Sequence, residues 1–276
     1  MSSIIHIPIS VMIFTLNEEI HLLSCLASVE WSDDVIVIDS FSTDRTKEIC
    51  REKGVRFFQN KFTGFGAQRN WALENTNPKY DWALILDADE RVPVELANEI
   101  GGVLRSPLEG VGAFRIKRCF YMWGRWLRHS SLYPNWVVRL IHKNRVRYVD
   151  RGHAESQEVK GRILELKHDL IDENLKGIEE WFERQNRYST KEAEYELKER
   201  SKGSFKVVNL FARDPLVCRA ALKQLAWRTP GRPLWYFLYS YFWRLGFLDG
   251  MDGLVFCSMK VAYQCMVSVK KYNLHR

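Results

Sequence analysis

Two aspartates, Asp87 and Asp89, follow an apolar run at residues 82–86. Because carboxylates at positions i and i+2 of a turn can converge on one hard cation, this spacing suits Mg²⁺ or Mn²⁺, which complete their shells with phosphate and water oxygens. The same acidic turn could instead cap the N-terminus of a following helix. Taken alone, the motif leaves both interpretations open.

Two earlier apolar runs also end in polar residues. Residues 9–15 lead into Thr15-Leu16-Asn17-Glu18-Glu19, and residues 34–39 lead into Asp39-Ser40-Phe41-Ser42-Thr43-Asp44. Carboxylates there can accept hydrogen bonds from a ribose or a uracil edge, while the hydroxyls can cap the next helix. Capping explains Thr43 and Asp44, but it does not explain why three successive strand ends are acidic. We therefore favour a ligand-binding edge.

A glycine-bearing segment, Gly64-Phe65-Gly66-Ala67-Gln68-Arg69-Asn70, lies between these motifs. Its glycines permit close approach of the backbone to a ligand, and Arg69 could reach a diphosphate. A surface loop that leads into a helix is the alternative. Together with Lys61, the segment provides the positive charge that an anionic ligand requires.

Apolar runs and helical patterns alternate along the first part of the chain, which predicts βαβ units and a parallel sheet. Open sheets of this kind bind ligands at the C-terminal ends of their strands. The predicted strands span residues 9–15, 34–39, 55–59 and 82–86, and the predicted helices span 20–29, 43–53 and 65–75. Strand-like stretches at 113–118 and 137–142, a polar segment at 150–158 and a charged helix at 175–200 follow.

In this order, the motifs resemble those of family 2 glycosyltransferases, which have the GT-A fold. The resemblance covers residues 8–200 and rests on Thr15-Leu16-Asn17-Glu18-Glu19, Asp39-Ser40-x-Ser42-x-Asp44-x-Thr46, Gln68-Arg69-Asn70 and Leu86-Asp87-Ala88-Asp89-Glu90. Within the family, the chain looks most similar to non-processive β-1,4-glucosyltransferases of the lipopolysaccharide inner core, which act on a membrane-held lipid acceptor.

The resemblance implies a nucleotide-sugar donor, UDP-linked, and Mg²⁺ or Mn²⁺ as cofactor. It places Asp39 near the base or ribose, Asp89 as principal metal ligand, and Asp87 as an assisting group at the ribose or a metal-bound water. Inversion requires in-line attack by the acceptor hydroxyl, with the metal stabilising the leaving diphosphate. The implied cofactor-binding residues are Thr15, Asn17, Glu19, Asp39, Ser40, Gln68, Arg69, Asp87 and Ala88.

A catalytic base must accept the proton of the acceptor hydroxyl. Relatives carry an acidic residue in a His-Glu pair, and the counterpart here is His153-Ala154-Glu155, which departs from the pattern by one inserted alanine. Glu155 is the predicted base, with Glu158 and Asp150 as alternatives. His153 could orient Glu155, and His168 could approach the metal, although such histidines are more often ordinary surface or core residues.

The net charge of +7 is concentrated at the C-terminal end. Residues 201–276 hold 12 Lys and Arg against 3 Asp and Glu, whereas residues 1–200 hold 29 against 31. The same segment contains 14 of the 36 aromatic residues, and this mixture suits an anionic membrane surface. No nucleic-acid-binding motif accompanies the charge, so no nucleic-acid partner is predicted.

Two short aromatic-rich helices are expected near residues 234–243 and 254–269. The cations expected to face lipid headgroups are Arg228, Arg232, Arg244, Lys270 and Lys271. Packing against the catalytic domain or against a second copy is the alternative. No apolar run reaches the roughly 18 residues of a transmembrane helix, and the QxxRW signature of processive synthases is absent. A single-addition enzyme is therefore favoured.

The six cysteines form no CxxC pair or metal-binding cluster, and the apolar N-terminal stretch lacks the basic start and cleavage site of a signal peptide. Both features favour a cytoplasmic protein with reduced thiols. Together with the basic, aromatic C-terminal segment, they predict a protein bound peripherally to the inner face of the cytoplasmic membrane.

The predicted fold class is α/β: a GT-A domain with a Rossmann-like mixed, mainly parallel sheet flanked by helices, and a helical membrane-associating extension. The catalytic domain spans 1–200, divided into a donor half at 1–111 and an acceptor half at 112–200, and the extension spans 201–276. The predicted enzyme transfers a hexose to lipopolysaccharide core or another lipid-linked glycan, and glucose is the expected sugar. A nucleotidyltransferase and a non-catalytic nucleotide-sugar-binding adaptor are the alternatives.

Overall fold

The computed structural model describes residues 6–151, 154–201, 225, 229 and 231–274, without the side chains at 150, 151, 154, 155 and 201. Contacts within the chain define two compact units. The first extends to Lys176, apart from residues 129–132 and Arg151, and the second contains residues 129–132, Arg151 and the chain from Gly177 onward. The domain limits expected from the sequence stay a prediction, but the helix that starts at Gly177 groups with the C-terminal helices.

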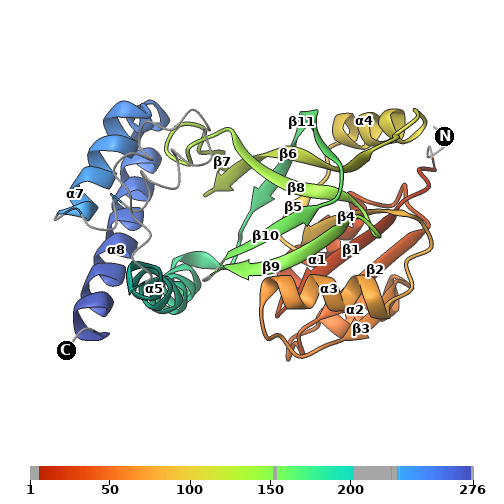
Figure 1. The fold of residues 1–276 in the computed structure, drawn as a ribbon, viewed down its shortest axis with the longest axis horizontal. Helices are drawn as coiled ribbons and strands as arrows, with labels where there is room; N and C mark the ends of the chain where they lie inside the picture. Colours follow the sequence, from red (N-terminus) through yellow and green to blue (C-terminus); the bar gives the residue numbers. More distant parts are fainter. Residues whose placement is uncertain (1–5, 152–153, 202–224, 226–228, 230, 275–276) are drawn as a thin grey trace. The chain divides into compact units, whose positions relative to one another are not determined.

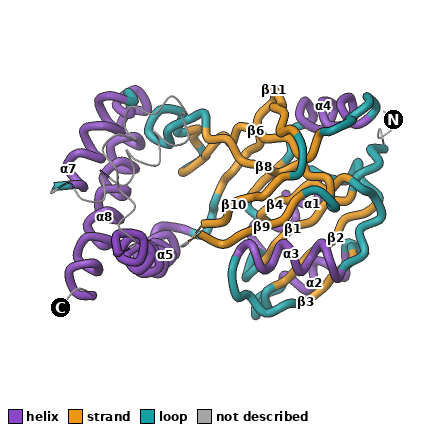
Figure 2. The backbone as a smooth tube through the Cα atoms, in the orientation of Figure 1, coloured by secondary structure: helices purple, strands orange, loops and turns teal. Residues whose placement is uncertain are grey.

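The first unit is built on a mixed sheet flanked by helices (Figures 1 and 2), which confirms the α/β architecture. Its strand order is β3-β2-β1-β4-β8-β6-β11-β5, with β7 paired to β6. Strands β3, β2, β1 and β4 are parallel, and β8 joins β4 in the antiparallel sense. The strands are β1 (Ser10–Thr15), β2 (Asp34–Asp39), β3 (Arg56–Gln59), β4 (Trp82–Asp87), β5 (Glu90–Arg91), β6 (Val111–Met122), β7 (Arg125–Trp126), β8 (Asn135–His142) and β11 (Arg162–Glu173). Strands β9 (Val146–Arg151) and β10 (Ala154–Val159) form a separate two-stranded sheet.

Both faces of β1 are buried because its alternating side chains meet a different layer on each side. Val11 and Ile13 belong to a core cluster with residues of helices α1 (Glu19–Ala27), α2 (Thr46–Glu52) and α4 (Val94–Leu104). Met12 belongs to a second cluster, with Ala72 of helix α3 (Phe65–Asn75) and Tyr148 of β9. The C-terminal end of β1 is therefore held at the centre of the unit, where the predicted ligand edge lies.

The second unit is helical. Helix α5 (Gly177–Ser201) packs against α8 (Gly250–Leu274), and α8 also contacts helix α7 (Arg232–Phe237), the π-helix η2 (Leu238–Trp243) and the short helix η3 (Gly246–Asp249). Buried Glu196 of α5 accepts hydrogen bonds from Arg232 at 2.6 Å and from Lys271 at 2.7 Å. These ion pairs fix both α7 and α8 to α5. None of the described helices is both long and apolar enough to span a bilayer.

Three of the cations expected at lipid headgroups are used inside this unit. Arg232 and Lys271 pair with Glu196, and Lys270 donates to the carbonyl oxygen of Asn186 and to the hydroxyl of Ser189 at 2.9 Å. Their side chains face α5, which corrects the placement expected from the sequence. Arg228 lies outside the described residues.

A substitution at Gly112 of β6 provides a test of how closely the first unit is packed. A Cβ atom there would lie 2.6 Å from the carbonyl oxygen of Lys160 and 2.5 Å from Val159, so Gly112→Ala must displace backbone. We expect a loss of about 1–3 kcal/mol in the free energy of unfolding, measured by urea denaturation. Gly102→Ala is the control, because its Cβ would meet nothing within 4 Å on helix α4, and it should gain about 0.5–1 kcal/mol. Equal effects of both changes would contradict the close packing at Gly112.

Candidate active site

The loops that follow β1 and β2 bind each other. The backbone N–H of Asn17 donates to the hydroxyl of Ser42 at 2.7 Å, and the amide oxygen of Asn17 accepts the backbone N–H of Thr43 at 2.8 Å. Asn17 has a positive φ of 55°, which asparagine tolerates better than most residues. The side chain of Asn17 therefore acts first as a bridge between two loops.

The acidic residues of these loops cap the helices that follow them. Asp44 accepts the backbone N–H groups of Glu19 and Thr46, both at 3.0 Å, so one carboxylate serves the starts of α1 and α2. Although partial burial opposes ionisation, bonds from Thr46 and Glu19 hold the pKa of Asp44 below its usual value. Glu19 in turn accepts the N–H of Arg45 at 3.0 Å. Helix capping thus explains more of the acidic residues in these two loops than the sequence suggested. Helix α2 begins at Thr46 and not at Thr43, where the sequence predicted its start.

Asp39 is fully buried at the end of β2, and its carboxylate is saturated. One oxygen accepts the hydroxyls of Thr15, at 3.0 Å, and Ser42, and the other accepts the backbone N–H of Ser42 at 2.9 Å and the amide of Gln59 at 3.0 Å. A carboxylate has about four acceptor positions, so all are filled. A contact between Asp39 and a ribose or uracil requires one of these partners to be displaced.

Gln68, Arg69 and Asn70 follow one another along α3, and each binds a different part of the first unit. Gln68 donates to Ser40 at 3.2 Å and to the carbonyl oxygen of Asn60 at 3.2 Å. Asn70 exchanges two hydrogen bonds with the backbone of Tyr148, at 2.8 and 2.9 Å. The motif therefore ties α3 to the loops after β2 and β3 and to strand β9.

Asp87 lies between two buried arginines. Arg69 donates to one carboxylate oxygen at 2.9 Å, and Arg139 of β8 donates to the other. Burial opposes ionisation, but Arg139 and Arg69 together hold the pKa of Asp87 well below its usual value. The guanidinium of Arg69 also stacks over Phe14 and Tyr148, 5.6 Å from each ring. Arg69 is thus a partner of Asp87 in the interior, and the contact with a diphosphate that the sequence suggested stays a prediction.

The charge network continues beneath Asp87. Fully buried Glu90 accepts from Arg139 at 2.6 Å and from the backbone N–H of Asp87 at 3.0 Å. Arg118 of β6 lies 3.6 Å from Glu90 and 3.1 Å from Asp172 of β11. Glu90 was part of the predicted acidic motif, but Arg118, Arg139 and Asp172 were not predicted as site residues. A charged residue within the predicted apolar strand at 137–142 was a usable signal for Arg139.

Two buried donors near Asp87 have no hydrogen-bond partner within the described part of the chain. They are the hydroxyl of Tyr148 and Nε of Arg139. Buried polar atoms normally find a partner, so this corner of the site retains hydrogen-bonding capacity for water or a ligand.

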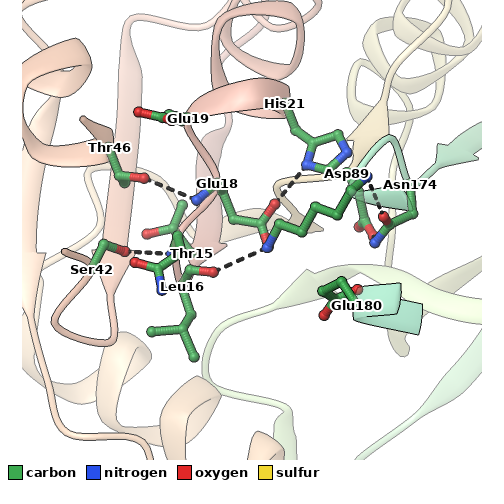
Figure 3. A network of polar contacts seen from close by, with 12 residues as sticks. Thr15, Leu16, Glu18, Glu19, His21, Ser42, Thr46, Asp89, Asn174 and Glu180 are labelled. Atoms are coloured by element: carbon green, nitrogen blue, oxygen red, sulfur yellow. Dashed lines mark hydrogen bonds and ion pairs between the residues drawn. The ribbon is translucent and has the colours of Figure 1, made fainter. Parts of the chain in front are cut away.

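Asp89 is only half-buried, and it lies on the turn between β4 and β5. Its carbonyl oxygen accepts the N–H of Glu173 at 3.0 Å, and its carboxylate lies 3.5 Å from the amide of Asn174 (Figure 3). The described residues contain no group of three His, Cys, Asp or Glu side chains that could hold a metal. A Mg²⁺ or Mn²⁺ ion at Asp89 would therefore take most of its ligands from phosphate and water, which is how Mg²⁺ is commonly bound with nucleotides.

A lysine supplies positive charge at the same edge. Lys176 donates to Glu18 at 2.6 Å and to the carbonyl oxygen of Leu16 at 3.2 Å. Figure 3 shows Glu18 also bound to His21, at 2.7 Å. Because Nε2 of buried His21 accepts the N–H of Leu175 at 2.7 Å, Nδ1 carries the proton that His21 donates to Glu18. These hydrogen bonds hold the segment that follows β11 against the loop after β1 and the start of α1.

The structure brings together Thr15, Asn17, Glu19, Asp39, Ser40, Gln68, Arg69, Asp87, Ala88 and Asp89, but His168 lies elsewhere. The ring of His168 binds Glu99 at 2.8 Å, and His168 lies five strand residues, about 16 Å, from Glu173 beside Asp89. The side chains of Glu155 and Asp150, and all of His153, lie outside the described residues.

The site lies where open α/β sheets bind ligands, at the C-terminal ends of the parallel strands, and its turns are acidic. A model of glycosyl transferase family 2 matches residues 10–163, more than half of the chain, so the chain belongs to this family. It is similar to the lipopolysaccharide core biosynthesis glycosyltransferase LpsC of Rhizobium meliloti, with 26% identity over 93% of this chain and 91% of that protein.

Two solved structures are also similar. Glucosyl-3-phosphoglycerate synthase of Mycobacterium tuberculosis, solved with Mn²⁺, UDP-glucose and phosphoglyceric acid, is 28% identical with a TM-score of 0.34. That match covers 41% of this chain and 44% of the other, so it spans less than half of either protein. TarS of S. aureus, solved with UDP-GlcNAc, is 15% identical with a TM-score of 0.46, over 96% of this chain and 89% of the other.

Asp172 should make stability depend on pH. Burial, opposed by Arg118, raises its pKa to about 7, so the native carboxyl keeps its proton across a range where the unfolded one has lost it. The stabilisation is present below about pH 4 and is lost as the pH rises through 7, by at most about 1.4 kcal/mol per pH unit. Urea denaturation of Asp172→Asn between pH 4 and 8 should show a flatter profile than the parent protein.

The control is Asp81→Asn, because Asp81 is an exposed carboxylate of the same type. It should leave the pH profile unchanged. If the free energy of unfolding of Asp172→Asn changes with pH as steeply as that of the parent protein, the raised pKa of Asp172 is contradicted.

Proposed function

We propose that this family 2 glycosyltransferase is inverting and metal-dependent, and that it moves glucose from UDP-glucose to lipopolysaccharide core or another lipid-linked glycan. The observation that carries the proposal is the gathering of the β1, β2 and β4 ends on one sheet edge in a chain of this family. The lipopolysaccharide assignment is supported by the alignment with LpsC over nearly the full length of both proteins. Family membership leaves the nucleotidyltransferase and adaptor alternatives without support.

We assign the donor nucleotide to the edge formed by the loops at residues 15–19 and 40–44 and the turn at 87–89. The loops are bonded to each other before any ligand arrives, so little ordering remains for binding. Asp39, Asn17 and Glu19 mainly maintain the shape of this edge. Lys176 is the cation that we assign to the diphosphate, because its ammonium group has three N–H donors and uses two of them on Glu18 and the carbonyl oxygen of Leu16.

Asp89 would hold the Mg²⁺ or Mn²⁺ ion together with diphosphate oxygens. When bound, the ion stabilises the negative charge of the departing nucleoside diphosphate. Asp87 keeps the turn in place through Arg69 and Arg139. Its two oxygens are already paired, so we assign it a supporting role at this site.

Glu155 is proposed as the base, with Glu158 and Asp150 as the alternatives. The acceptor hydroxyl attacks C1 of the sugar as the bond from C1 to the diphosphate oxygen breaks, and the carboxylate takes the hydroxyl proton. One sugar is added per encounter. The reaction takes place at the inner face of the cytoplasmic membrane, where a lipid-linked acceptor would be held.

Calorimetry with a panel of UDP-sugars, in the presence and absence of Mn²⁺ or Mg²⁺, tests the donor and the metal. UDP-glucose should bind most tightly, and Asp89→Asn should weaken its metal-dependent binding by at least about tenfold because a metal ligand is lost. Asp81→Asn is the matched control and should bind as the parent protein does. If no UDP-sugar binds with either metal, the UDP-donor assignment is wrong.

Single-turnover kinetics of Glu155→Gln tests the base. The rate of the chemical step should fall by about 10²–10⁴-fold, while the affinity for the donor is unchanged, because an amide cannot accept the proton. Glu158→Gln should keep most of the activity. The opposite pattern would assign the base to Glu158.

A further inference from the structure

The segment α7–η2 of the second unit carries an apolar face with large exposed side chains. Positions 234, 238 and 242 form one row spaced by four residues, and positions 235, 239 and 243 form the adjacent row, so both rows lie on the same side of the helix. We call this set the apolar face; its members are Leu234, Trp235, Leu238, Tyr239, Phe242 and Trp243. Trp243 is 81% exposed and Trp235 is 59% exposed, which is unusual for tryptophan.

The other side of the same segment is anchored to its own unit. Ser240 is buried, and its carbonyl oxygen would lie 2.7 Å from a Cβ placed on Gly246 of η3, which shows how closely the two turns pack. Asp249, at the end of η3, accepts the backbone N–H groups of His129 at 3.0 Å and Ser130 at 2.7 Å. The apolar face is therefore presented by a well-fixed helix.

The exposed apolar surface continues past η2. Phe247, Leu248 and Met251, on η3 and the start of α8, are also exposed. Large apolar side chains exposed together on one segment mark a candidate interaction site. Asp249, an acidic residue within the same stretch, is buried and satisfied by backbone N–H groups, so it presents little negative charge there.

We infer that the apolar face inserts into the interfacial layer of an anionic lipid bilayer. Trp and Tyr are the residues favoured at the boundary between headgroups and acyl chains, and here they alternate with Leu and Phe on one helical face. Besides Arg232, Lys270 and Lys271, which bind α5, residues 201–276 hold nine Lys and Arg against three Asp and Glu, and this surplus of positive charge attracts anionic lipid. This inference rests on the membrane location proposed above and identifies the surface that makes the contact.

Insertion of apolar side chains carries more of this binding than the cations of α8. Lys270 and Lys271 are bonded to α5, and detaching them would break the contacts that hold the unit together. The general positive charge brings the protein to the membrane, and the apolar face holds it there. Removal of two apolar side chains should therefore have a large effect on binding.

Co-sedimentation with phosphatidylcholine vesicles, with and without phosphatidylglycerol, tests the inference on the full chain. The parent protein should bind, and it should bind more tightly when phosphatidylglycerol is present. The double change Phe242→Ser and Trp243→Ser should lower the partition coefficient by about tenfold or more. Both side chains are exposed, so the variant should fold; its urea denaturation curve checks this point.

Val269→Ser is the matched control. Val269 is 67% exposed on α8 and lies 18 helical residues, about 27 Å, from Met251, so its loss should leave vesicle binding unchanged. Equal binding by the double variant and the parent protein would overturn the inference, as would equal losses in the double variant and the control.

Sedimentation velocity separates the other possible occupants of the face. A parent protein that fails to bind vesicles and dimerises, with the double variant monomeric, would assign the apolar face to a second copy of the chain. A monomeric parent protein that fails to bind vesicles would mean that another part of the chain covers the face. Both results would overturn the inference. No donor or metal is present, so failure here leaves the transferase assignment to be decided by the calorimetry.

Discussion

The placement of Asp87 between Arg69 and Arg139 is the interaction on which the active-site edge depends. Both arginines are buried, whereas the side chain of Asp87 is 34% exposed, and ion pairs of this kind add little net stability compared with an apolar contact. The network therefore acts mainly as a geometric constraint. It joins α3, β4 and β8, and through Glu90 it reaches β5 and β6, so both halves of the sheet are held around the turn that carries Asp89.

The loops after β1 and β2 add a second constraint at the same edge. Their polar side chains are largely satisfied by one another, with Asp39 and Asp44 each accepting several protein hydrogen bonds. A nucleotide binding here would meet a surface whose shape is already set. Its affinity would then depend on how readily the existing partners of Asp39 and Lys176 are exchanged for groups of the nucleotide.

The second unit uses its charges and its apolar residues differently. Glu196 forms ion pairs with Arg232 and Lys271, and Lys270 binds polar groups of α5. These basic side chains therefore stabilise the packing of α7 and α8 against α5. The large apolar side chains of α7 and η2 are left on the surface instead. In an isolated helical unit this distribution is unfavourable in water, and it becomes favourable when an interface covers the exposed side.

The chemistry of the edge was readable from the sequence, because strand periodicity and the polar residues that end each apolar run are local properties. Strands at 34–39 and 82–86, the helix at 65–75 and the acidic turns were all predicted from such runs, and the family followed from their order. The ion-pair partners of these acidic residues could not be predicted from the sequence. Arg139 lies 52 residues from Asp87 along the chain, and only the order of strands in the sheet brings the two together. The same holds for β11, whose alternating charged residues resemble a surface segment, and for Lys270 and Lys271, whose contacts depend on how α8 meets α5. Tertiary structure decides these roles because the energy of a charge depends on what surrounds it, and those surroundings come from distant parts of the chain.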